Sequence, residues 1–247
     1  NGSSAMRAAR LTAGDMVAVG KVSVFVFELV PEPETDTTRQ ELPEPPDLIE
    51  STMLMPAWQA EAMKAREVVR ARPAGGRLLE VGCGEGGFLR LAAAHFDVQG
   101  IDASDYAVRT VRESCGLPAE RVDIEHAPLP PGPFDTIVAF NVLEHLADPE
   151  AVVGRLFEAL KPDGALIGSV PNAAGLVGRP AAAIGSRLDP SHRSVLRPAA
   201  WRRIFSEAGF ARVRLFGELN FGRNRSVYLR GRGWKHLAIG IMFICEK

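Results

Sequence analysis

Short apolar runs alternate with longer amphipathic stretches through the middle of the chain. The runs are bounded by glycine, proline and charged residues, and the stretches between them carry apolar residues at helical spacing. Strands that alternate with helices in this way are typical of βαβ units and a parallel sheet. The predicted strands are Leu78–Val81, Val98–Ile101, Thr136–Phe140 and Ala165–Val170, and the predicted helices are Gly87–His95, Asp105–Cys115 and Pro149–Leu160.

The C-terminal part continues this pattern less regularly. Pro198–Ala208 predicts a further helix that ends at Gly209, and two strands are predicted after it, over Ala211–Glu218 and His236–Cys245. Together with the central units, these elements predict an α/β fold with a doubly wound, Rossmann-like sheet.

The N-terminal part differs from the rest of the chain. Val17–Glu28 is rich in β-branched and aromatic residues and predicts a strand or hairpin arm, a β extension to the main fold. Pro31–Asp47 combines five prolines with a cluster of carboxylates, which predicts a linker. We therefore expect an arm and linker over residues 1–47 and one main domain over residues 48–247, whose first helix covers Ala57–Ala71.

Composition narrows the class of protein. The 247 residues are 46% hydrophobic and carry a net charge of −1, which argues against a nucleic-acid partner even though arginines concentrate in the C-terminal third. Val17–Val30 is interrupted by Lys21 and Glu28 and is shorter than the roughly 20 residues of a membrane span. Three cysteines are too few for a disulfide framework, so we expect a cytoplasmic protein without a membrane partner, and an oligomer is compatible with this composition.

A glycine cluster joins the first predicted strand of the main domain to its helix. In LLEVGCGEGGFLRL (Leu78–Leu91), Gly82, Gly84 and Gly87 allow a tight turn and a close approach of a ligand to the backbone. The helix start directs free N–H groups into the same crevice. The spacing also fits G-x-G-x-x-G, so this segment alone leaves a nicotinamide dinucleotide open as the ligand.

A carboxylate follows at the end of the next predicted strand. Asp102 lies twenty positions after Gly82, in VQGID, where it could accept both hydroxyl protons of a ribose. It could also cap the following helix, although Ser104 and Asp105 are better placed for that role. The pair of features predicts a site for an adenosine-bearing cofactor.

Four segments in order give a more specific resemblance. EVGCGEG, GID, FDTIVAFNVLEHLAD and LKPDGALIGSVPN resemble the sequence of class I methyltransferases that depend on S-adenosylmethionine (SAM), in particular the ubiquinone-biosynthesis O-methyltransferase type, over about residues 78–172. The resemblance implies a seven-stranded sheet with an antiparallel last strand, and SAM as the cofactor, with S-adenosylhomocysteine as its product.

The resemblance also implies roles for individual residues in holding the cofactor. Glu80 and the backbone of Gly82, Cys83 and Gly84 would face the methionine part, with Cys83 as a small packing residue. Asp102 would bind the ribose, and the Asn141 carbonyl would meet the amino group. Asp123, Ile124 and Glu125 would hold the adenine, and either Asp123 or Glu125 could be its acceptor.

Two histidines are candidates for the chemistry. His145, in VLEHL, could take a proton from an acceptor hydroxyl or amine, or it could have a structural role in its loop. His192 could be a second base or an anion clamp, or an ordinary loop histidine. The five histidines show no paired ligand spacing, so no metal is expected. The segment Asn172–Arg197 is the candidate substrate lid.

Three functions are compatible with these residues. The first is methyl transfer to an oxygen or nitrogen of a small-molecule acceptor, in specialised metabolism. The second is methylation of protein or RNA, with the arginine-rich third as a docking face. The third is a SAM-binding protein without catalysis.

Overall fold

The computed structural model describes residues 16–19, 22–25, 55–220, 226–230 and 233–247. It has two units, residues 1–44 and residues 45–247. In the first unit, strands β1 (Met16–Val19) and β2 (Val22–Phe25) pair antiparallel, the hairpin form of the predicted N-terminal β extension. The predicted linker over residues 31–47 lies outside the described residues.

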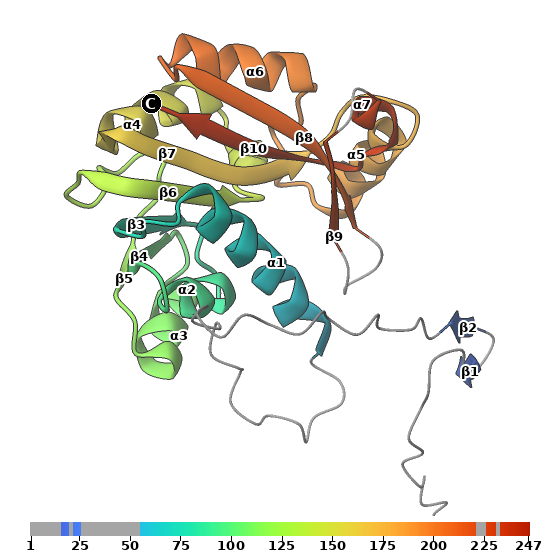
Figure 1. Ribbon diagram of the computed structural model, residues 1–247, viewed down its shortest axis with the longest axis horizontal. Coiled ribbons are helices and arrows are strands. Elements are labelled where there is room, and N and C mark those ends of the chain that lie inside the picture. Colours follow the sequence, from blue (N-terminus) through green and yellow to red (C-terminus); the bar gives the residue numbers. More distant parts are fainter. Residues whose placement is uncertain (1–15, 20–21, 26–54, 221–225, 231–232) are drawn as a thin grey trace, which may run out of the picture. The chain divides into compact units, whose positions relative to one another are not determined.

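In the second unit, the apolar runs form one eight-stranded sheet (Figure 1). The strand order is β5-β4-β3-β6-β7-β10-β8-β9, in which β5 to β7 are parallel neighbours and β10 runs antiparallel to both β7 and β8. This confirms the doubly wound fold and the antiparallel last strand. The strands are β3 (Arg77–Val81), β4 (Asp97–Asp102), β5 (Ala119–Arg121), β6 (Phe134–Phe140), β7 (Leu160–Pro171), β8 (Arg212–Asn220), β9 (Ser226–Leu229) and β10 (Gly240–Glu246).

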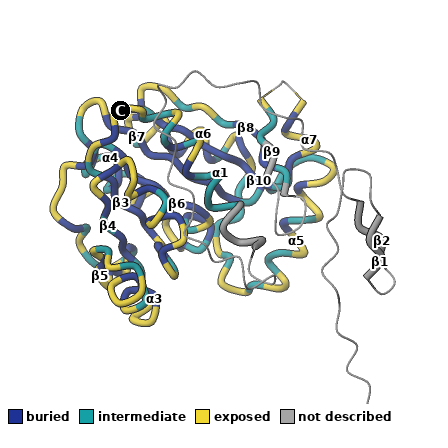
Figure 2. Tube along the Cα trace, turned by 60° about the horizontal axis from the view of Figure 1, so that its bottom comes forward, coloured by how far each residue is buried: buried dark blue, intermediate teal, exposed yellow. Residues whose placement is uncertain are grey.

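Helices cover both faces of the sheet and enclose two apolar clusters. On one face lie α1 (Met55–Ala71), α2 (Gly87–Ala92) and α3 (Asp105–Thr110), whose buried side chains pack with Leu78, Val138 and Met242. On the other face, α4 (Pro149–Ala159) and α6 (Pro198–Glu207) pack against Ile137 and Phe243. Figure 2 shows the central strands as the buried layer between them. No helix among the described residues is long and apolar enough to cross a membrane.

The chain order places a crevice at the middle of the sheet. From β3 the chain moves outward through β4 and β5, and it then returns to β6 on the other side of β3. Loops at the carboxyl ends of β3 and β6 therefore leave in opposite directions, and α/β sheets bind ligands at such a point. The glycine turn follows β3, and His145 follows β6.

The C-terminal part departs from the sequence prediction in two places. Residues 236 and 237, predicted as the start of a strand, end the short helix α7 (Trp234–Leu237), and the strand begins only at Gly240. Trp234 is buried against Gly217 of β8, so tertiary packing overrides the local strand preference. The edge strand β9 is an addition to the seven predicted strands.

Two features of the helices were not predicted from the sequence. Helix α5 (Gly178–Leu188) lies inside the segment predicted as a lid. The helix predicted over Asp105–Cys115 changes to π-helical geometry at Val111–Cys115 and ends at Gly116, which has a φ of 64°.

Replacing Gly168 with alanine should destabilise the domain by about 2–3 kcal/mol. Gly168 lies in β7 between β6 and β10, and an added Cβ would overlap the carbonyl oxygen of Ala139 and the ring of Phe243. Gly154→Ala, in α4 with open space around it, is the matched control and should stabilise by about 0.5–1 kcal/mol. Urea unfolding of both variants measures the difference, and equal effects would contradict the packing described here.

Candidate active site

The glycine turn after β3 contacts β4 on one side and the segment after β6 on the other. The amides of Gly82 and Cys83 both donate to the carbonyl of Ile101 in β4, at 2.8 and 3.1 Å. Gly82 has a φ of 72°, and a Cβ added there would meet the side chain of Val142, just after β6. Gly84 and Gly86 also have positive φ, at 49° and 81°. Only glycine adopts this series of conformations without strain, so the sequence fixes the shape of the turn.

Asp102 joins this turn to the end of β4. Its Oδ2 accepts a hydrogen bond from the amide of Gly84 at 3.0 Å, and its Oδ1 accepts from the amide of Ser104 at 2.9 Å. The cap of α3 is Ser104, whose Oγ accepts from the amide of Ala107 at 3.4 Å. Because a carboxylate offers about four acceptor positions, the half-exposed Asp102 keeps acceptor capacity for a ligand.

Glu80 lies at the end of β3, beneath the turn, and is 5% exposed. Its Oε2 has no hydrogen-bond partner among the described residues. Burial, followed by the negative charge of Glu61, raises the pKa of Glu80 well above its ordinary value, while Lys64 acts in the opposite direction. A buried carboxyl oxygen without a partner is costly, and a ligand ammonium would satisfy it.

Cys83 is a packing residue within the turn. Its side chain is 5% exposed and lies against Gly100 of β4, where any Cβ would meet it at 2.9 Å. Burial raises the pKa of the thiol to about 12, so it stays protonated at neutral pH and is a poor nucleophile.

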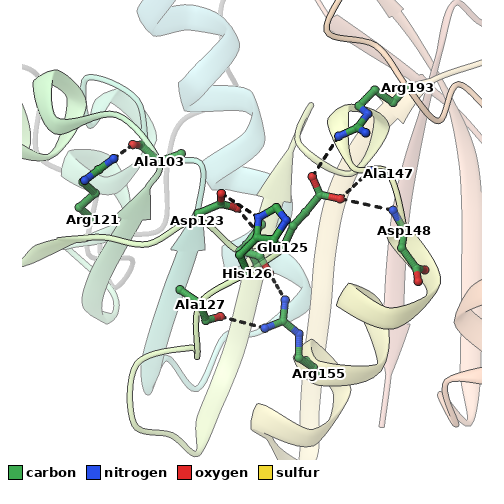
Figure 3. Close-up of polar contacts among 11 residues, drawn as sticks. Ala103, Arg121, Asp123, Glu125, His126, Ala127, Ala147, Asp148, Arg155 and Arg193 are labelled. Carbon is green, nitrogen blue, oxygen red and sulfur yellow. Dashed lines mark hydrogen bonds and ion pairs between the residues drawn. The ribbon is translucent and has the colours of Figure 1, made fainter.

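Two carboxylates follow β5, and the structure gives them different partners (Figure 3). Asp123 is exposed and accepts from the amide of Glu125 and from His126 Nδ1, both at 3.0 Å; the His126 hydrogen bond is the main cause of its lowered pKa. Glu125 accepts from the amides of Ala147 and Asp148, at 2.6 and 3.4 Å.

Two arginines contact the segment that follows β5. Arg193 Nη1 lies 3.4 Å from Glu125 Oε2, and the guanidinium of Arg155 donates to the carbonyls of Ile124 and Ala127. The Ile124 side chain is buried in the core. Glu125 is thus committed to contacts within the protein, whereas Asp123 remains exposed at the sheet edge.

Asn141, directly after β6, has an unusual backbone conformation. Its φ is 54°, a left-handed value that asparagine tolerates better than most residues. Its amide donates to the carbonyl of Ser169 at 2.8 Å, and its Oδ1 accepts from Ser169 Oγ at 3.4 Å. These contacts fix the point where the chain leaves the sheet beside the glycine turn.

The two candidate catalytic histidines lie side by side. His145 ends a 3₁₀ turn over Leu143–His145, and His192 follows α5. Their ring centroids are 4.8 Å apart, at an angle of 65°. Nδ1 of His145 is 2.8 Å from Ser191 Oγ, and Nε2 of His192 is 3.7 Å from Asp189 Oδ2. The pair is formed by residues far apart in the chain.

Glu144 lies beside this pair, in the same 3₁₀ turn as His145. It is 1% exposed, its Oε2 has no hydrogen-bond partner among the described residues, and burial raises its pKa to about 8. Ligand atoms of Glu144, His145 and His192 all lie within 4.8 Å of one another, and one carboxylate with two imidazoles suits a divalent metal. The expectation of no metal rested on spacing along the chain, and it stays a prediction.

The candidate lid is anchored at both ends. Asn172 is buried and donates from Nδ2 to the carbonyl of Ala238 at 2.8 Å. At the other end, the amides of Arg193 and Ser194 donate to the carbonyl of Glu144, at 2.9 and 2.8 Å. The hydroxyl of Ser194 donates to the carbonyl of Leu146. Between these anchors α5 exposes Ile184. The end of the lid is thus part of the histidine site.

Comparison with known proteins shows what the chain is similar to. A family model described as a methyltransferase domain matches residues 57–215. A probable S-adenosylmethionine-dependent methyltransferase of Mycolicibacterium smegmatis is 36% identical, over 56% of this chain and 53% of its own length. The ubiquinone biosynthesis O-methyltransferase of Thiobacillus denitrificans is 35% identical, over 44% of this chain and 50% of its own length. The trans-aconitate 2-methyltransferase of Paracidovorax citrulli is 30% identical, over 65% of this chain and 64% of its own length. The chain spans about half to two thirds of these relatives.

Solved structures share the fold. A SAM-dependent methyltransferase of Thermotoga maritima, titled a possible histamine N-methyltransferase, superposes with a TM-score of 0.64 at 18% identity, over 78% of this chain and 91% of its own. Magnesium protoporphyrin IX methyltransferase of Synechocystis with bound S-adenosylhomocysteine gives a TM-score of 0.56 at 19% identity, over 78% and 84%.

The buried carboxyl of Glu144 should make stability depend on pH. Its folded pKa of about 8 lies above the ordinary value of 4.5, so the unfolded chain loses this proton first and stability falls as pH rises between these values. Glu144→Gln removes the titration, and its free energy of unfolding relative to the parent should therefore rise by up to about 4 kcal/mol from pH 5 to pH 8. Urea unfolding at both pH values measures this, and a pH-independent difference would show that Glu144 titrates normally.

Proposed function

Because this chain belongs to the methyltransferase-domain family, we propose that it transfers the methyl group of SAM to an oxygen or nitrogen of a small-molecule acceptor. One observation carries the proposal: Glu80, whose buried Oε2 has no hydrogen-bond partner in the described part of the chain, lies under the glycine turn, and Asp102 lies beside it on the neighbouring strand. A buried acid beneath the glycine turn suits the cationic amino-acid end of SAM, and a carboxylate one strand away suits its ribose.

The other cofactor contacts follow from this placement. Asp123 is the adenine acceptor, because it is exposed while Glu125 is occupied by the Ala147 and Asp148 amides. The carbonyl of Asn141 receives the amino group together with Glu80. When bound, SAM supplies a methyl group already activated by its positively charged sulfur, so the protein needs alignment and a base but no covalent nucleophile.

His145 is the base in this proposal. His145 follows β6, and β6 is the neighbour of β3, the strand that precedes the glycine turn. A neutral imidazole there takes the proton of the acceptor O–H or N–H. His192 borders the same space from the lid segment. The lid over residues 172–197 forms the acceptor wall, which places substrate choice in the part of the chain outside the cofactor contacts.

Charge pairing favours a small acceptor over a protein or RNA. Several arginines of the C-terminal third form ion pairs with carboxylates: Arg203 with Glu150, Arg212 and Arg214 with Glu246, and Arg230 with Glu67. These pairs reduce the positive face that a polyanion would need. The three cysteines are free thiols, which suits a cytoplasmic enzyme, and we place it in biosynthetic, specialised metabolism.

Asp102→Ala should weaken the binding of S-adenosylhomocysteine by about 1–3 kcal/mol, because the ribose hydroxyls lose a charged acceptor. Isothermal titration calorimetry measures the affinity. Asp97→Ala is the matched control, since Asp97 is exposed at the opposite end of the same strand and should leave the affinity unchanged. Equal affinity in Asp102→Ala and the parent would remove Asp102 from the site.

His145→Ala should slow turnover about 10²-fold or more while cofactor affinity is retained. The assay follows S-adenosylhomocysteine formation from SAM with a panel of phenols, amines and sugars, and His95→Ala, at an exposed histidine before β4, is the control. Cofactor binding without product from any acceptor would instead support a non-catalytic SAM-binding protein.

A further inference from the structure

We propose that Asp189 and Ser191 position His145 for catalysis by fixing which of its ring nitrogens carries the proton. The inference rests on the proposed function for its catalytic meaning, but the hydrogen-bond chain itself can be tested without any reaction. Neither residue belongs to the segments that carry the family resemblance. Both lie at the end of the lid, just after α5.

The chain of contacts runs from a carboxylate through a hydroxyl to an imidazole. Ser191 Oγ donates to Asp189 Oδ1, and the same oxygen of Asp189 accepts the amide of Ser191 at 3.0 Å. Ser191 Oγ is also 2.8 Å from Nδ1 of His145. One hydroxyl thus connects a side chain of the lid to the ring of the candidate base.

The direction of each hydrogen bond follows from the donors available. Hydrogen bonds from Ser191 lower the pKa of Asp189, so this carboxylate is ionised at neutral pH and can only accept. The single hydroxyl proton of Ser191 is therefore used toward Asp189. Nδ1 of His145 must then be the donor to Ser191 Oγ, which leaves the lone pair of a neutral imidazole on Nε2.

This tautomer gives His145 one basic nitrogen in a fixed place. A free imidazole in water exchanges its proton between both nitrogens, so part of its population has no lone pair on Nε2. When Nε2 takes the acceptor proton, the positive charge that develops is compensated through Ser191 by Asp189. The titratable groups that face the ring are His192, Glu144 and Asp189.

The lid and the base are held in one rigid arrangement. The Arg193 and Ser194 amides bind the carbonyl of Glu144, the residue before His145, and Ser194 Oγ binds the carbonyl of Leu146, the residue after it. His145 and Ser191 are 46 positions apart in the chain, yet their backbones are pinned together on both sides of the contact. The lid in this position therefore brings both the acceptor wall and the carboxylate of Asp189 close to His145.

The first experiment measures the tautomer in the whole 247-residue chain. Long-range ¹H–¹⁵N correlation spectra resolve the two ring nitrogens of each histidine, and His145 is identified as the signal that His145→Ala removes. We expect a neutral imidazole protonated at Nδ1. Ser191→Ala should shift His145 toward the Nε2–H form, and Ser191→Thr, which keeps the hydroxyl, should restore the Nδ1–H form.

Asp189→Asn is the sharper variant because it reverses the chain. The new amide can donate to Ser191 Oγ, whose own proton then points at Nδ1 of His145 and forces the proton of the ring onto Nε2. We expect an inverted tautomer and a lower kcat than in Ser191→Ala, which itself should lose about tenfold or more, while KM for SAM stays constant in both. Ser206→Ala, at an exposed serine of α6, is the control and should match the parent.

Three outcomes would overturn the proposal. They are an Nε2–H tautomer in the parent protein, no change of tautomer in Ser191→Ala, and Zn²⁺ titration that binds His145 and His192 and raises kcat in chelator-treated protein. The expected tautomers without turnover of any acceptor would leave the hydrogen-bond chain established and count against the proposed function alone.

Discussion

The hydrogen bonds that Asp102 accepts from Gly84 and Ser104 hold together the end of the sheet at which the candidate site lies. They join the turn after β3 to the end of β4, so two loops that leave neighbouring strands have one fixed spacing. The turn can reach Asp102 only because its glycines adopt positive φ. Two other candidate cofactor contacts lie close to this junction, Glu80 at the end of β3 and Asn141 directly after β6.

The loop after β6 connects the candidate cofactor contacts to the candidate lid. Glu125, in the segment after β5, accepts hydrogen bonds from the amides of Ala147 and Asp148. It also forms an ion pair with Arg193 of the candidate lid. The carbonyl of Glu144 binds the lid on the same loop. Polar contacts therefore connect the segment after β5 to the loop that carries His145, because these groups share partners rather than acting separately.

Local signals were sufficient for the parts of the structure in which the chain determines its own conformation. The glycines of residues 82–86, the carboxylate of Asp102 and the cap at Ser104 could all be predicted, because turn geometry and capping depend on residues close in sequence. Strand β5 was not located, since three residues after Pro118 give no periodic pattern. The start of β10 was misplaced because Trp234 is buried by contacts with distant strands.

The candidate site also contains features that the sequence could predict and features that it could not. Sequence reasoning could not choose between Asp123 and Glu125, because the choice depends on amides more than twenty positions away. It named His145 and His192 separately but could not place them in contact, nor find Asp189 and Ser191 beside them. Burial of Glu144 was equally invisible, since an acidic residue before a histidine ordinarily indicates a solvated position.

Hydrogen exchange followed by mass spectrometry, with and without S-adenosylhomocysteine, tests the central claim most directly. The junction at Asp102 predicts that the ligand slows exchange of the amides in residues 82–87 and 102–104, and in the segment around Asp123. Protection elsewhere with none at these amides, or the same protection by a nicotinamide dinucleotide, would contradict it.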